Sequence, residues 1–194
     1  MIYSTHLAAG VLAGFCVLGF GSPEPDTWPM LVGIAAAGSL IPDLDHGRSI
    51  LQSIFERGVG TTSGKIPVAG RVVGYAGRTA VRGINRMFSR IVRHRGIMHS
   101  IMAVVVFTVL LKILWPGISP AGVQCFAAGY LSHILIDTLN PQGVPLLWPY
   151  RKKFSLPVFN ITTGSFFERR VLFPILSALA GYVAFTGPVG TLLS

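Results

Sequence analysis

The chain has 194 residues, of which 51% are hydrophobic and only 12% are charged, and its mean hydropathy is +0.61. Because a typical soluble domain carries roughly 25% charged residues, this composition excludes an ordinary soluble domain and predicts an all-α integral membrane protein. The net charge of +9 therefore bears on membrane topology and anionic lipid before it bears on nucleic acid.

Five apolar runs follow one another along the chain, and each is predicted to be a transmembrane helix. They cover residues 3–21, 28–41, 100–115, 121–139 and 166–187. In the first run, Gly10 and Gly14 stand four residues apart, a spacing that lets a second helix approach closely in lipid. We expect residues 1–194 to form a single membrane domain built on these five helices.

A basic segment, residues 47–93, interrupts this pattern with eight arginines, one lysine and one acidic residue. Within it, arginines recur at helical spacing opposite apolar side chains, which predicts an amphipathic interfacial helix over residues 67–93. Such a helix suits the surface of an anionic leaflet. A solvated loop helix is the alternative. A nucleic-acid-binding helix is disfavoured, because the apolar side is too complete for a helix surrounded by water.

The distribution of charge predicts which way the chain is oriented. Five spans would place the N-terminus and the connections 47–93 and 140–169 on the same side of the membrane. That side holds every lysine and arginine except Lys112. Since basic loops stay in the cytoplasm, we expect a multi-pass protein of the bacterial inner membrane whose basic face is cytoplasmic.

The same topology gathers ionisable side chains at the cytoplasmic helix ends. Such groups are costly at membrane depth unless they are paired or bind metal. His133 and Asp137 are four residues apart, so both face the same way on a helix. Pro42 ends the second helix and leaves the next residues free to surround an ion from a loop. The predicted metal ligands are His6, Asp43, Asp45, His46, His94, His99, His133 and Asp137.

A mixture of imidazole and carboxylate ligands suits zinc, or manganese or iron, better than calcium. The candidates outnumber the ligands of one four-coordinate zinc, so more than one ion is expected, as in two-metal phosphoesterases. Some of these candidate residues can also be explained without a metal ion. His6 can be an interfacial residue at a helix end, and Ser165-x-x-Glu168 also fits a helix-capping box.

Five short motifs, spread over almost the whole chain, resemble those of the YdjM-type family. They are Thr5-His6, Pro42-Asp43-x-Asp45-His46, His94-Arg95-Gly96-x-x-His99-Ser100, Ser132-His133-x-x-x-Asp137 and Thr163-Gly164-Ser165-x-x-Glu168. The resemblance implies an inner-membrane, metal-dependent hydrolase. The set is also distantly similar to zinc-dependent phospholipase C, which implies phosphoester chemistry by analogy of fold. The basic segment 47–93 departs from the family pattern and leaves the substrate and partners open.

The expected reaction is hydrolysis of a phosphoester in a lipid or lipid-linked substrate at the cytoplasmic interface. Water activated by the metal is the expected nucleophile, with Asp45 or Glu168 as the base. Arg95, or Arg93 beside it, is expected to steady the negative charge that develops.

Two other functions fit parts of the pattern. A metal-ion transporter would use similar ligands, although transporter sites usually lie near the bilayer midplane and these ligands lie at helix ends. A non-catalytic membrane anchor would recruit a partner through the basic helix 67–93. Substitution of His133 and Asp137 separates the anchor from the enzyme, because only the enzyme needs both side chains.

Overall fold

The structure is a computed structural model that describes residues 1–20, 27–45, 97–150, 152–156 and 161–187, without the side chains of Phe20, Leu44 and Asp45. The chain divides into two compact units. The first comprises Met1–Pro42 and Gly96–Ser194, and the second comprises Asp43–Arg95. The second unit corresponds closely to the basic insertion predicted from the sequence. The amphipathic helix predicted there, over residues 67–93, lies outside the described residues.

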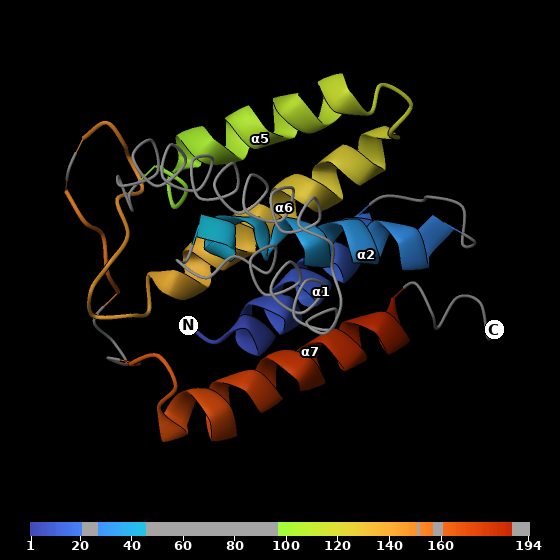
Figure 1. The fold of residues 1–194 in the computed structure, drawn as a ribbon. Helices are drawn as coiled ribbons and strands as arrows, with labels where there is room; N and C mark the ends of the chain where they lie inside the picture. The colour runs from blue at the N-terminus through green and yellow to red at the C-terminus, as the bar shows by residue number, and fades with distance from the viewer. Residues whose placement is uncertain (21–26, 46–96, 151, 157–160, 188–194) are drawn as a thin grey trace, which may run out of the picture. The chain divides into compact units, whose positions relative to one another are not determined.

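The regular secondary structure in the described residues is helical, as the sequence predicts, and none of these residues belongs to a strand. One isolated antiparallel bridge joins Val144 and Phe154. The helices are α1 (Tyr3–Phe20), α2 (Trp28–Gly38), the 3-10 helix η2 (Ile41–Asp45), α5 (Ile101–Leu114), α6 (Pro120–Asp137), the π-helical turn η3 (Glu168–Leu172) and α7 (Phe173–Thr186) (Figure 1). Each of the five predicted helical segments thus contains a helix.

The helix boundaries follow local chemistry. Ser100 caps α5 by accepting the N–H of Ala103 at 3.2 Å, and Ser119 caps α6 by accepting the N–H of Gly122 at 3.1 Å. Serine is a favoured residue at this position because its side chain satisfies an N–H that the helix leaves open. α2 ends at Gly38, three residues earlier than predicted, and the apolar chain continues through a turn into η2.

The expectation that these helices cross a membrane is not met in the residues that the structure describes. Among them, no helix is both long enough and apolar enough to span a bilayer. The lengths give part of the reason, because α2 has 11 residues and α5 and α7 have 14 each, whereas a spanning helix needs about 20.

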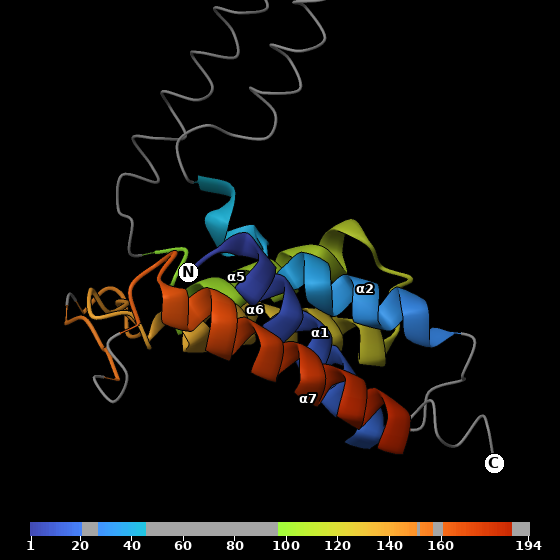
Figure 2. The ribbon, with the colours of Figure 1, turned by 90° about the horizontal axis from the view of Figure 1, so that it is seen from below.

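Two helices, α1 and α6, are central to the first unit. α1 packs against α2, α6 and α7, while α6 packs against α1, α2 and α5. Both views show α7 alongside α1 (Figures 1 and 2). The buried side chains of Ala103, Tyr130 and Ile134 join α5 to α6, and those of Leu31 and Cys125 join α2 to α6. The segments that carry His6, His99, His133 and Asp137 therefore meet around α6.

Glycines let α1 and α6 come close to the same end of α2. At Gly129 of α6 a Cβ would collide with the backbone carbonyl of Ala35. At Gly10 of α1 a Cβ would collide with the side chain of Ser39, and at Gly14 it would meet Ala35. The close approach predicted from the Gly10–Gly14 spacing is confirmed, and the partner helix is α2. This packing brings the first turn of α1 toward the last turns of α6.

Several helices expose large apolar side chains to the surroundings. On α5 most of the large apolar residues are at least 41% exposed, and α7 exposes a similar set. They are Ile101, Met102, Val105, Val106, Val109, Leu110, Ile113 and Leu114 on α5, and Ile175, Leu179, Tyr182 and Phe185 on α7. Soluble monomers rarely expose apolar patches of this extent, so these faces suit an apolar environment or a partner better than water.

Candidate metal centre

His133 and Asp137 lie one turn apart at the C-terminal end of α6. As the spacing predicts, their side chains face the same way, with His133 Nε2 3.5 Å from Asp137 Oδ2. His133 is fully buried, and the side chain of Asp137 is 14% exposed. A carboxylate at this depth needs partners. The N-terminal ammonium of Met1 donates to Asp137 Oδ1 at 2.9 Å, and the other partners are imidazoles.

His99 reaches this pair from the turn that precedes α5. Its Nε2 lies 3.3 Å from Asp137 Oδ2 and 3.3 Å from His133 Nε2. The turn is attached to α6 by Tyr130, whose hydroxyl donates to the carbonyl oxygen of Met98 at 2.9 Å. Ser100, which caps α5, follows directly. His99 is thus held between a helix cap and a hydrogen bond from the neighbouring helix.

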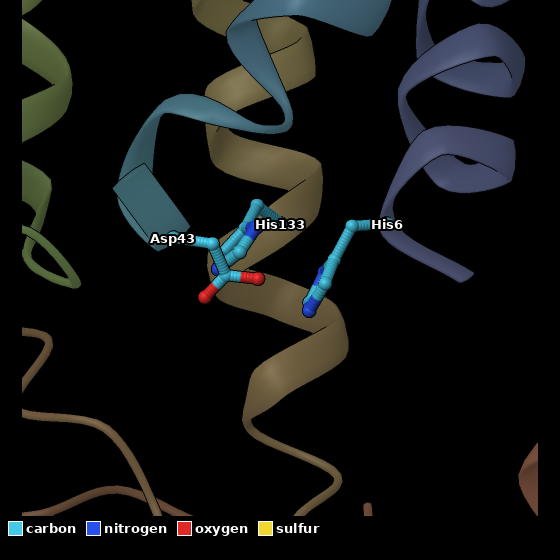
Figure 3. Close-up of side chains that lie close together, drawn as sticks. All are labelled: His6, Asp43 and His133. Atoms are coloured by element: carbon cyan, nitrogen blue, oxygen red, sulfur yellow. The ribbon is translucent and has the colours of Figure 1, made fainter. Parts of the chain in front are cut away.

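His6 approaches from the first turn of α1. Its Nε2 lies 3.3 Å from Oδ1 of Asp137, the carboxylate oxygen that does not face His99 and His133. Its ring stacks on that of His133, with 3.7 Å between the ring centroids and 16° between the ring planes. Figure 3 shows these two side chains extending toward each other from α1 and α6. We refer to His6, His99, His133 and Asp137 as the His–Asp cluster.

The orientation of His133 is fixed by a hydrogen bond behind the cluster. Its Nδ1 donates to the carbonyl oxygen of Ser39 at 2.7 Å. Because a carbonyl only accepts, Nδ1 carries the proton, and Nε2 is the ring nitrogen that faces His99 and Asp137. Metal-binding histidines almost always have such a partner on the other ring nitrogen. Ser39 itself is fully buried where α1 and α6 close on α2.

The spacing of three ligand atoms fits one face of a tetrahedral zinc site. Zinc bonds of about 2.0–2.1 Å in tetrahedral geometry place neighbouring ligand atoms about 3.4 Å apart. The atoms His99 Nε2, His133 Nε2 and Asp137 Oδ2 are separated by 3.3, 3.3 and 3.5 Å. Three protein ligands leave a fourth position open, as in catalytic zinc sites. The donor set therefore fits a divalent metal without rearrangement.

The other predicted site residues are not part of the His–Asp cluster. His46, His94 and Arg95 lie outside the described residues, and so does the side chain of Asp45. Asp43, which Figure 3 also draws, is the first residue of the second unit, so the cluster is built from the first unit alone. The expectation that these residues bind metal or act in catalysis stays a prediction.

Glu168, predicted as a base or a helix cap, is fully buried. Its carboxylate accepts the backbone N–H of Ile2 at Oε1 and that of Gly164 at Oε2, each at 2.6 Å. Its own N–H donates to Ser165 Oγ at 3.2 Å, which is half of the predicted capping box. Glu168 is not among the described residues whose ligand atoms converge as a metal site.

Four contributors to the site were not predicted from the sequence, and one is the N-terminal ammonium of Met1, 2.9 Å from Asp137 Oδ1. Ser39 supplies a carbonyl oxygen, Tyr130 anchors the turn that carries His99, and Ile2 binds Glu168 through its backbone. Ser39 and Tyr130 carry a weak signal, since each places a hydroxyl within an apolar run. Ile2 carries none, because a backbone N–H is common to almost every residue.

The fold and this cluster define an all-α protein with a buried histidine–carboxylate centre of the type that holds divalent metal ions. The family model described as YdjM inner membrane protein matches residues 1–192. The chain therefore belongs to the YdjM inner membrane protein family.

Comparison with curated proteins gives relatives from three bacteria. The chain is 34% identical over 145 residues to "Inner membrane protein YdjM" of Escherichia coli (strain K12) and to that of Shigella flexneri. Those alignments cover 73% of this chain and 61% of each relative, so the chain spans less than two thirds of their length. It is 24% identical over 173 residues to "Uncharacterized protein YvsG" of Bacillus subtilis (strain 168), covering 89% of the chain and 88% of that protein. No solved structure matches the chain.

Proposed function

We propose that this protein is a metal-dependent hydrolase of the bacterial inner membrane, in which His99, His133 and Asp137 hold the catalytic ion. The observation that carries the proposal is the triangle of 3.3, 3.3 and 3.5 Å between their ligand atoms. These distances equal the edge of a tetrahedral zinc site, about 3.4 Å. The hydrogen bond from His133 to the Ser39 carbonyl supports the same role.

Each residue of the His–Asp cluster has a distinct part. His99 and His133 supply imidazole nitrogens, and Asp137 supplies the charge that balances a cation. Divalent ions in such sites activate water for attack and stabilise negative charge in hydrolysis. The other oxygen of Asp137, Oδ1, lies 3.3 Å from His6 Nε2 and 2.9 Å from the N-terminal ammonium of Met1, so a second ion beside His6 would have to replace that ammonium. Asp43, Asp45 and His46 are the sequence candidates for further ligands of the second ion.

The proposed substrate is a phosphoester in a lipid or lipid-linked molecule, reached from the cytoplasmic side. The relatives named as inner membrane proteins support a membrane location, and so do the exposed apolar faces of α5 and α7. Arg95 is the residue proposed to hold a phosphate oxygen, since guanidinium groups bind phosphate in a bidentate manner. A metal transporter is less well supported, because the cluster lies at helix ends.

Metal content tests the proposal directly. The full chain is purified in detergent, stripped with a chelator, reloaded with zinc or manganese, and analysed for bound metal per chain. We expect at least one ion per wild-type chain. Asp137→Asn should lower the affinity by more than about 100-fold, beyond the 10–100-fold that outer-shell partners contribute. Wild-type protein without stoichiometric metal would overturn the proposal.

A matched control separates loss of the ligand from loss of the fold. Ser132→Ala alters the residue next to His133, but its hydroxyl only donates to the carbonyl of Gly129 within α6, so metal binding should stay at the wild-type level. Hydrolysis is then screened with micelles of phosphatidylglycerol, phosphatidic acid and a polyprenyl phosphate. Release of phosphate or a phosphorylated headgroup should require both metal and Asp137. Release that survives Asp137→Asn would contradict the assigned centre.

A further inference from the structure

Glu168 connects the start of α1 to the turn before η3. Both of its carboxylate oxygens accept backbone N–H groups at 2.6 Å, from Ile2 and from Gly164. The side chain is fully buried. A buried carboxylate is stable only when hydrogen bonds replace its water, and bonds from backbone N–H groups to an ionised carboxylate are among the stronger ones in proteins.

Ile2 is the residue from which α1 begins. Its carbonyl oxygen accepts the N–H of Thr5 at 3.1 Å and that of His6 at 3.3 Å. An isoleucine side chain cannot cap a helix, and the carboxylate of Glu168 provides an acceptor from elsewhere in the chain. A negative group at this position also interacts favourably with the helix dipole. His6 follows Ile2 by four residues, or about one helical turn, so the place of Ile2 sets the place of the imidazole.

The other side of Glu168 is itself firmly held. Ser165 Oγ accepts the N–H of Glu168 at 3.2 Å. Gly164 has a φ of +76°, a conformation that glycine adopts without strain, and this directs its N–H toward Oε2. The adjacent Thr163 accepts a hydrogen bond of 3.0 Å from Asn140, three residues after the end of α6. Glu168 is therefore fixed relative to the helix end that carries Asp137.

We propose that Glu168 is a positioning residue for the metal centre. By holding Ile2, it places His6 against His133 and Asp137 and so sets the affinity of the centre for metal. It acts through the backbone of α1 and neither ligates the ion nor accepts a proton from substrate. This inference rests on the proposed metal centre.

The test measures metal affinity instead of activity. Zinc dissociation constants are obtained by competition with a chelator for the full-length wild type and for Glu168→Gln in detergent. The glutamine keeps the size but presents an N–H₂ to one of the two backbone donors. We expect the dissociation constant to rise at least about tenfold, the scale typical of outer-shell partners, with unchanged stoichiometry. The cobalt(II) absorption spectrum should keep the band shape of the same ligand set.

Three further variants keep the result interpretable. Ser132→Ala removes a hydroxyl that donates to the Gly129 carbonyl within α6 and leaves the hydrogen bonds of Glu168 in place, so zinc affinity should stay within about twofold of wild type. In a His6→Ala background, Glu168→Gln should have little added effect, because residues that act through one another are non-additive. If Glu168→Gln does not fold, Ile2→Pro removes the same N–H donor at a position before the helix and should weaken zinc binding similarly.

Any of the following outcomes would overturn the inference. Wild-type zinc affinity in Glu168→Gln with lost hydrolysis would make Glu168 a base. A lost metal equivalent or an altered cobalt spectrum would make it a ligand. Equal weakening by Ser132→Ala would show a general loss of stability. A wild-type chain that binds no metal overturns the proposed function as well, whereas wild-type binding with undiminished binding by Glu168→Gln overturns this inference alone.

Discussion

His6 and His133 stack face to face, with ring centroids 3.7 Å apart and ring planes 16° from parallel. One ring comes from the first turn of α1 and the other from near the end of α6, and both are fully buried. The pair is therefore a packing contact between the two central helices as well as part of the His–Asp cluster. Substitutions can separate these two roles.

Replacement of His6 by phenylalanine should preserve packing and remove the nitrogen. We expect His6→Phe to keep a stacked ring on His133 and a melting temperature, without added metal, close to that of the wild type. His6→Ala should lose about 1–3 kcal/mol, because it leaves a cavity at the contact. Both variants should bind less metal than the wild type. The measurements are thermal unfolding in detergent and metal per chain. Full metal binding by His6→Phe would exclude His6 as a ligand.

Loss of the Tyr130 hydroxyl should disturb the centre through His99. Tyr130→Phe removes the hydrogen bond to the Met98 carbonyl, which anchors the turn that carries this histidine. We expect a loss of about 1 kcal/mol in unfolding free energy and weaker zinc binding, by up to about tenfold. Phe107→Leu, a change in an aromatic neighbour of Tyr130, provides a packing control that keeps this hydrogen bond. Unchanged zinc affinity in Tyr130→Phe would show that the turn needs no such anchor.

A methyl group at residue 129 should push α6 away from α2. The Cβ of Gly129→Ala would overlap the Ala35 carbonyl, and overpacking of this kind costs about 1–3 kcal/mol or more. The shift also moves His133 from the Ser39 carbonyl, so metal binding should fall with stability. Gly33→Ala is the matched control in α2, because its Cβ meets nothing within 4 Å. That variant should be neutral or slightly stabilising. A wild-type melting temperature for Gly129→Ala would contradict this packing.

A charge on the apolar face of α5 tests whether lipid covers that face. Val109 is 53% exposed near the middle of the helix. An aspartate at the centre of a membrane-inserted helix costs about 2.5–3.5 kcal/mol, so Val109→Asp should reduce the fraction of protein that resists extraction from membranes by alkaline carbonate. Val109→Leu should behave as wild type. Equal membrane retention of the aspartate variant would place this face away from lipid.

Some of the centre follows directly from local sequence. His133 and Asp137 share one helix, and a spacing of four residues fixes their common direction whatever packs around them. The helices themselves follow from apolar runs bounded by serine caps and prolines. The predicted runs also extended beyond two of the helices, because Leu40 and Ile41 follow the end of α2 and Leu139 follows the end of α6.

Other parts of the centre depend on packing between distant segments. The stacking of His6 on His133 needs α1 and α6 to close on α2, and the hydrogen bond to the Ser39 carbonyl involves a backbone atom that any residue would supply. Glu168 shows the same limit. Its sequence context predicts a capping residue, and half of that cap is present, but the bond to Ile2 joins opposite ends of the chain. No local pattern encodes such a pairing.

In the His–Asp cluster, His99 comes from the turn before α5, His133 and Asp137 come from α6, and His6 comes from α1. An ion bound there would cross-link these segments in the folded chain and find no such grouping in the unfolded one. Binding to the folded form alone raises stability by about 2.7 kcal/mol when free metal is 100 times its dissociation constant. Folding and metal supply would then be thermodynamically coupled, and a chelator would act on this protein as a denaturant does.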